Sequence, residues 1–135
     1  MNHAFSFVFA LACFLFTACS DYGLKVESNG HTLYYLEPVT QQEAQNTLDY
    51  LHTINHNFSE PPLPFQLSKE DVRYVFKYPV QNKDQIEGGN LTYITNFGRH
   101  LSSEVFNGAP VDVHLMDETL DKTYKVVAYS KPGEE

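Results

Sequence analysis

The chain has 135 residues, and its 17 acidic side chains outnumber nine basic ones, for a formal net charge of −8. Nucleic-acid-binding domains collect Lys and Arg on one face, so this composition argues against a nucleic-acid partner. The only cysteines, Cys13 and Cys19, lie near the N-terminus. The rest of the chain therefore has no thiol for a disulfide, a metal or a nucleophile and must be held by its apolar core.

The first segment is an apolar run over residues 4–18 that ends in Phe16-Thr17-Ala18-Cys19. At about fifteen residues it is shorter than the roughly twenty that a membrane-spanning helix needs. Its length and its exit through small residues are typical of a secretory signal. The segment resembles a bacterial lipoprotein signal peptide, in which a small residue precedes an invariant cysteine. The resemblance implies removal of residues 1–18, a diacylglyceryl group on Cys19 and, with Ser20 next, sorting to the outer membrane.

Two features keep other signals open, of which one is Phe16, where lipoboxes favour Leu. Residues 1–3 contain no Lys or Arg, although a signal peptide normally starts with positive charge. A plain secretory peptide cut elsewhere and an uncleaved anchor are the alternatives. We expect a lipid-anchored envelope protein with the following organisation: signal peptide 1–18, tether 19–29 with an early strand at 23–27, one domain over 30–130 and a disordered tail at 131–135.

The hydrophobic period then alternates between strand and helix. Thr40 followed by Glu43 is a capping box, which predicts a helix start. Asn107-Gly108 predicts the end of a second helix, led in by Gly88-Gly89 with Asn90 as a possible cap. Ser68 to Asp71 reads as a polar turn. The expected strands are 31–36, 63–67, 72–78, 110–116 and 122–129, and the two helices carry apolar stripes at Ala44, Leu48, Leu51, Asn55 and Phe58 and at Leu91, Ile94, Phe97, Leu101 and Val105.

The element order βαββαβ with an extra C-terminal strand predicts an α+β fold resembling the ferredoxin-like sandwich. Right-handed crossovers would put both helices on one face of an antiparallel sheet. Numbering the five expected strands in chain order, the sheet order would be 5-4-1-3-2. The pattern points Leu33, Tyr35, Phe65, Tyr74, Phe76, Val111, Val113 and Leu115 at the helices, and Tyr34, Gln66, Arg73, Lys77, Asp112 and His114 at the opposite, open face, unless strand parity slips by one.

Two pairs of segments suggest an internal repeat. Residues 58–67 align without gaps on residues 106–115, and residues 36–39 echo residues 77–80. Either the domain arose by duplication, or two βαβ units obey the same packing rules.

Three clusters of polar residues are candidate sites of chemistry. His52 and His56 lie one helical turn apart, but the zincin pattern His-Glu-x-x-His and a third ligand are missing. The group Asp112, His114, Asp117, Glu118 and Asp121 could suit Ca²⁺, yet polar turn chemistry explains it as well. His100, Ser102, Ser103 and Glu104 are helix neighbours, which does not by itself build a catalytic triad. We therefore expect no metal, no cofactor and no catalytic residue.

The open sheet face is the remaining candidate site. Tyr and Arg are favoured at protein contacts, because they combine area with directed hydrogen bonds. We expect a non-enzymatic module that binds a protein partner through Tyr34, Arg73, Lys77 and His114. The alternatives are an open face with no partner, a small-ligand or metal-binding lipoprotein, and a cell-wall hydrolase.

Overall fold

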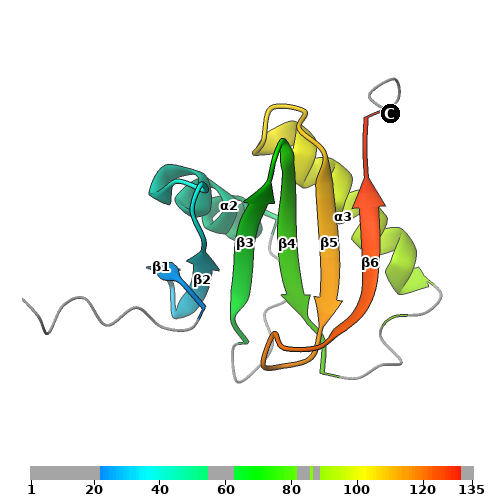
Figure 1. Ribbon diagram of the computed structural model, residues 1–135, viewed down its shortest axis with the longest axis horizontal. Coiled ribbons are helices and arrows are strands. Elements are labelled where there is room, and N and C mark those ends of the chain that lie inside the picture. The colour runs from blue at the N-terminus through cyan, green and yellow to red at the C-terminus, as the bar shows by residue number, and fades with distance from the viewer. Residues whose placement is uncertain (1–21, 55–62, 82–85, 87–88, 132–135) are drawn as a thin grey trace, which may run out of the picture.

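In the computed structural model, residues 22–54, 63–81, 86 and 89–131 are described, and these form one six-stranded sheet backed by two helices (Figure 1). The predicted signal peptide and Cys19 lie outside these residues. The elements in chain order are β1 Leu24–Ser28, β2 His31–Tyr35, α2 Gln41–Thr53, β3 Phe65–Glu70, β4 Arg73–Pro79, α3 Gly89–Glu104, β5 Val111–Met116 and β6 Thr123–Tyr129.

Helix α2 begins where the capping box predicts. Thr40 has an extended backbone, and its side-chain oxygen accepts the Glu43 N–H at 3.1 Å. This bond satisfies one of the N–H groups that the first helical turn leaves free. Ala44, Leu48 and Leu51 form the buried stripe. Asn55 and Phe58, which the sequence placed on the same stripe, lie outside the described residues.

Helix α3 ends before the predicted stop signal. Asn107 and Gly108 both have positive φ, 57° and 90°, a conformation that Asn and Gly adopt at lowest cost. The turn brings the Gly108 N–H to the Ser102 carbonyl at 2.7 Å, which satisfies an acceptor of the last helical turn. The cap expected at Asn90 is wrong, because α3 already starts at Gly89.

The hairpin between β3 and β4 is tighter than the sequence predicts. Pairing continues to Glu70 opposite Arg73, so only Asp71 and Val72 form the turn, with Asp71 at φ 56°. The turn predicted from Ser68 onwards is wrong. Ser68 and Glu70 lie on the open face of β3, where polar side chains are accommodated. Because their neighbours are polar as well, the sequence does not show the alternation of apolar and polar residues that indicates a strand.

The sheet order corrects the expected topology. The strands follow the chain, β1-β2-β3-β4-β5-β6, with β2–β3 and β4–β5 parallel and the other pairs antiparallel. The sheet is therefore mixed rather than antiparallel, and β2 lies between β1 and β3 instead of in the middle. The α+β class and the two helices are as predicted, but the order 5-4-1-3-2 is wrong. Both orders bury the same apolar side chains, so the burial pattern could not distinguish them.

The two crossovers have opposite hands. In Figure 1, strands β2 and β3 run upward, and β4 and β5 run downward. In both pairs the strand that comes later in the chain lies to the right of the earlier one. Both helices lie behind the sheet. The β4–α3–β5 connection is consequently right-handed and the β2–α2–β3 connection left-handed. Parallel crossovers are right-handed in about 98% of cases. The prediction that both helices lie on one face of the sheet is thus correct. The right-handed rule on which it was based does not hold for the β2–α2–β3 connection.

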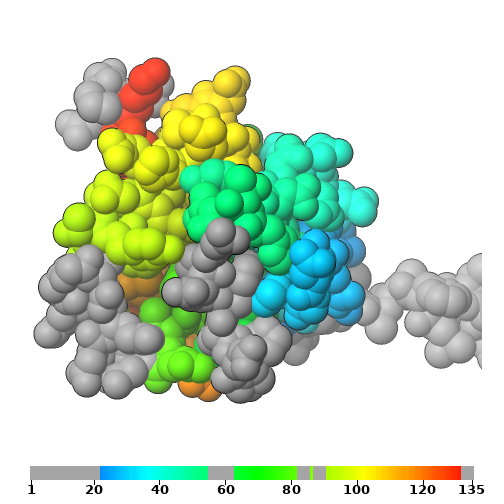
Figure 2. Space-filling model, turned by 180° about the vertical axis from the view of Figure 1, so that it is seen from behind, coloured from blue at the N-terminus to red at the C-terminus, as the bar shows by residue number. Residues whose placement is uncertain are grey.

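Both helices cover the same face of the sheet (Figure 2). Helix α2 packs on β1 and β2, and α3 packs on β5 and β6. Phe76 is at the centre, with its ring 5.5 Å from Phe65 and 5.3 Å from Phe97. All eight residues predicted to face the helices belong to this core, namely Leu33, Tyr35, Phe65, Tyr74, Phe76, Val111, Val113 and Leu115.

Candidate interaction face

The open face, meaning the side of the sheet away from both helices, carries one continuous row of side chains across all six strands. Each member is the direct partner of the next in the strand pairing, and partners in a ladder point to the same face. Three of the four predicted binding residues, Tyr34, Lys77 and His114, lie on this row. The full row is Lys25, Tyr34, Gln66, Lys77, His114 and Val126.

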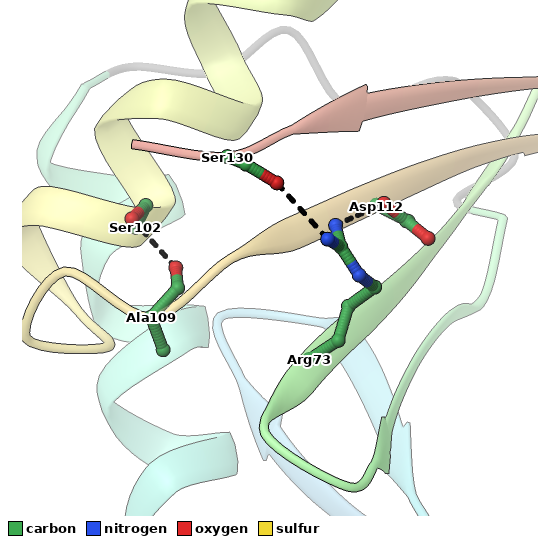
Figure 3. A network of polar contacts seen from close by, with 5 residues as sticks. All are labelled: Arg73, Ser102, Ala109, Asp112 and Ser130. Atoms are coloured by element: carbon green, nitrogen blue, oxygen red, sulfur yellow. Dashed lines mark hydrogen bonds and ion pairs between the residues drawn. The ribbon is translucent and has the colours of Figure 1, made fainter. Parts of the chain in front are cut away.

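Arg73, the fourth predicted residue, lies on the same face near the start of β4. Its Nη1 is 2.7 Å from Asp112 Oδ1, and its Nη2 donates to Ser130 Oγ at 2.9 Å (Figure 3). The two ion-pair side chains are 33% and 18% exposed, so solvent screens the pair only in part. Arg73 therefore joins β4, β5 and the end of β6, in addition to any contact that it offers a partner.

His114 is half-buried between Lys77 and Val126 in the row. Burial lowers the pKa of His114 below its usual value, and the positive charge of Lys77 adds to this, while Asp112 and Glu70 act in the opposite direction. The imidazole is therefore mostly neutral at pH 7 and can both donate and accept a hydrogen bond.

Tyr22 crosses part of the open face, which the sequence did not predict. Its carbonyl accepts a hydrogen bond from Gln66 Nε2 at 2.9 Å, and its hydroxyl donates to the Thr119 carbonyl at 3.0 Å. Its ring centre is 5.1 Å from that of Tyr34. Gln66 is only 5% exposed, so this contact provides the partner that a buried amide needs. The segment expected to be a tether is thus hydrogen-bonded to the sheet at residue 22. From residue 24 onwards it forms strand β1 of that sheet.

Gly23 allows this turn from the open face into β1. It has φ of +100°, and a Cβ there would lie 2.5 Å from the Tyr35 carbonyl oxygen and 2.6 Å from Leu36 Cδ2. Any other residue would meet both strain and a clash. A glycine directly after an aromatic residue and before a strand was the one signal in the sequence that could have indicated the contact.

Some apolar residues are buried away from the main core. Val75 and Met116 alternate onto the open face, and Leu120 lies in the turn between β5 and β6. All three are 5% exposed or less, yet none belongs to the core under the helices. The open face is consequently polar along its row and partly covered at the end where Tyr22 meets the β5–β6 turn.

The acidic turn uses its central carboxylate for its own fold. Asp117 Oδ1 accepts the N–H groups of Asp121 and Lys122 at 2.9 and 3.2 Å and the Thr119 hydroxyl at 3.2 Å. Desolvation acts to raise the pKa of Asp117, but the hydrogen bonds from Lys122 and Asp121 outweigh it and lower the pKa. Local turn chemistry therefore explains this cluster.

The two other candidate clusters, the histidine pair on α2 and the Ser–His–Glu group on α3, do not form sites within the described residues. The His52 ring lies 5.4 Å from that of His31, and His56 is outside the described ranges. Ser102 is buried and donates to the Ala109 carbonyl at 2.6 Å (Figure 3). Ser103 donates to the His100 carbonyl. Over the part of the chain that is placed, no three His, Cys, Asp or Glu side chains are grouped closely enough to hold a metal ion.

A sequence model described as the AF_1994_N family N-terminal domain matches residues 25–128. The chain belongs to this family. The AF_1994_N match begins in β1 and ends in β6, so it spans the whole sheet, whereas Tyr22 and Gly23 precede it. No curated protein and no solved structure matches the chain significantly.

None of the helices in residues 22–54, 63–81, 86 and 89–131 has both the length and the apolar content to cross a bilayer.

Proposed function

We propose that this chain is a lipid-anchored protein of the bacterial cell envelope, held by a diacylglyceryl group on Cys19, that binds another protein through its open face. The single observation that carries the binding part is the row of cross-strand partners that contains Tyr34, Lys77 and His114, with Gln66 between Tyr34 and Lys77. The anchor part rests on the lipobox-like Phe16-Thr17-Ala18-Cys19, and Ser20 favours the outer membrane.

The position of Tyr22 limits how far the proposed lipid anchor at Cys19 can lie from the open face. Tyr22 follows Cys19 by three residue steps, and an extended chain spans at most about 3.6 Å per step, or about 11 Å in total. Tyr22 is bonded to Gln66 and to the β5–β6 turn. An acylated Cys19 would therefore hold the open face close to the lipid headgroups. The expected partner is a protein in, or directly beside, the same membrane.

The chemistry of the face indicates the kind of surface that fits it. Lys77 offers positive charge within an acidic chain, and the charge of Arg73 is already paired with Asp112. His114 offers a neutral imidazole, and Tyr34 offers aromatic area. A complementary surface would have hydrogen-bond acceptors or carboxylates beside an apolar patch. The net charge of −8 disfavours broad docking on anionic lipid, so headgroups alone are a poor substitute for a protein partner.

The test places a photocrosslinking amino acid at Lys77 in the full chain, expressed in its own host. Tyr93, on the exposed side of α3, provides the matched control on the opposite face. We expect Lys77 to capture one protein of defined mass and Tyr93 not to capture it. A second arm replaces Cys19 with Ala, which should move the chain out of the membrane fraction and remove the acyl mass.

The two parts of the proposal fail separately. Equal capture from Lys77 and Tyr93, or no capture from Lys77, would remove the binding face and leave the anchor. An unmodified N-terminus in the wild-type chain, with Cys19→Ala fractionating like wild type, would remove the anchor and the membrane-proximal partner.

A further inference from the structure

Two histidines from different elements meet where the β1–β2 hairpin lies against the end of α2. His31 is the first residue of β2, and His52 lies in the last turn of α2. Their ring centres are 5.4 Å apart, with 55° between the ring planes. Nδ1 of His31 and Nε2 of His52 are buried, but both residues are partly exposed, so water can reach the pair.

The spacing of the two rings suits the ligands of one tetrahedral metal ion. Zinc bonds imidazole nitrogen at about 2.0–2.1 Å, and at a tetrahedral angle two such rings have their centres about 5 Å apart. The observed separation of 5.4 Å therefore admits an ion without movement of either backbone.

The backbone on both sides of the pair is held in place. His31 directly follows the two-residue turn of the β1–β2 hairpin, in which Asn29 and Gly30 have φ of 52° and 79°, as a tight type I′ turn requires. Helix α2 packs on β1 and β2, and Leu51, next to His52, is fully buried. Two ligands on elements that are already packed lose little freedom when they bind an ion.

The surroundings of the pair favour a positive charge. Helix α2 ends at Thr53, and the carbonyl groups of a last helical turn carry partial negative charge that stabilises a cation. Asp49 lies three residues before His52, on the same side of the helix. The whole chain has a net charge of −8. A cation at this place therefore meets no electrostatic barrier.

We infer that His31 and His52 together bind one Zn²⁺ ion, with water molecules as its other ligands. The inference does not depend on the proposed partner or on the acylation of Cys19. Catalytic zinc sites have three protein ligands, so an ion on two is held less tightly and is exchanged more readily. The ion would join the start of β2 to the end of α2, and it would stabilise the folded chain in proportion to its occupancy.

The test titrates Zn²⁺ into the full-length chain, purified in detergent after metal removal with a chelator, and measures binding by calorimetry. Every protein carries Cys13→Ser and Cys19→Ser, which removes the only thiols. His100, exposed on α3, provides the matched control. We expect one Zn²⁺ per chain, an affinity roughly tenfold or more lower in His31→Gln and in His52→Gln, and a change of less than about twofold in His100→Gln.

Labelling with diethyl pyrocarbonate gives a second readout that needs no histidine variant. Zn²⁺ should protect His31 and His52 from the reagent and leave the labelling of His100 unchanged. No binding at millimolar Zn²⁺, equal affinities in His31→Gln and His100→Gln, or no protection of either paired histidine would each overturn the inference. Loss of binding in His52→Gln with His31→Gln like wild type would also overturn it, because the ion would then use a different second ligand.

Discussion

The two βαβ units of this domain have the same element order and the same helix face, yet they differ in hand and in extent. In the first unit, β2 and β3 share three registered pairs, Leu33–Phe65 to Tyr35–Leu67. In the second, β4 and β5 share six, from Tyr74–Val111 to Pro79–Met116. The second unit therefore contains the longer parallel ladder, and the first depends more on α2 and on the β3–β4 pairing.

The difference in hand bears on the origin of the sequence repeat. Two units of opposite hand cannot be superposed, so the echo between residues 58–67 and 106–115 does not reflect copies of one three-dimensional unit. The register agrees, because one echo matches Leu67 with Leu115, and the other, extended by one residue, matches Tyr35 with Phe76. Tyr35 pairs with Leu67, but Phe76 pairs with Val113. Of the two explanations left open by the sequence, the hand and the register favour shared packing rules.

The difference between the two units is tested most strongly by creating a cavity in the core of each. Phe76→Ala should lower the free energy of unfolding by about 3–5 kcal/mol, because Phe76 is fully buried among three aromatic rings. Leu48→Ala on α2 should cost about 2–5 kcal/mol. Urea denaturation measures both costs.

Hydrogen exchange then separates the two units. We expect Leu48→Ala to lose amide protection in β1, β2 and α2 while β4 and β5 keep theirs, because the six-pair ladder does not depend on α2. Phe76→Ala should lower protection throughout the sheet. The comparison is wrong if Leu48→Ala lowers protection equally in β4 and β5.

A smaller effect is expected at the helix ends. Ser102→Ala would leave the Ala109 carbonyl without its 2.6 Å hydrogen bond and should cost about 1–3 kcal/mol. The matched change in the first unit, Thr40→Ala, removes the cap of α2 and should cost about 1 kcal/mol. Thermal unfolding of both variants tests the order, and a larger cost for Thr40→Ala would contradict it.

The smallest effect concerns His114 and pH. The folded-state pKa of His114 lies below that of the unfolded chain, so between the two values the unfolded state binds more protons. Stability should therefore fall as the pH drops from about 6.5 toward the lowered pKa, and His114→Gln should flatten this dependence. Denaturation midpoints at pH 5.5 and 7.5 give the measurement. An unchanged slope in His114→Gln would assign the dependence to other groups.

Sequence reasoning succeeded where one local rule decides. The Thr40–Glu43 box, the Asn107-Gly108 stop and the strict alternation of Tyr74, Phe76 and Tyr78 each depend on near neighbours in the chain. The same alternation placed Tyr34, Arg73, Lys77 and His114 on one face. Their role in binding and the acylation of Cys19 stay predictions.

The failures share a physical cause, since each depends on contacts between distant segments. Strand order was missed because two topologies bury the same side chains. The Tyr22 contact was missed because it joins residues 44 and 97 positions apart in the sequence. The left-handed crossover opposes a rule that usually holds.

The agreement between chain order and sheet order makes the molecule separable. A break at the Asp71-Val72 turn would yield two fragments, one with β1, β2, α2 and β3 and the other with β4, α3, β5 and β6, that meet in the sheet only along β3 and β4. The strands of the two fragments do not interleave in the sheet. In a ferredoxin-like order, strands of one half would lie between strands of the other. The domain is thus suited to reassembly from two independently produced pieces, with the β3–β4 ladder as the joint that reports their association.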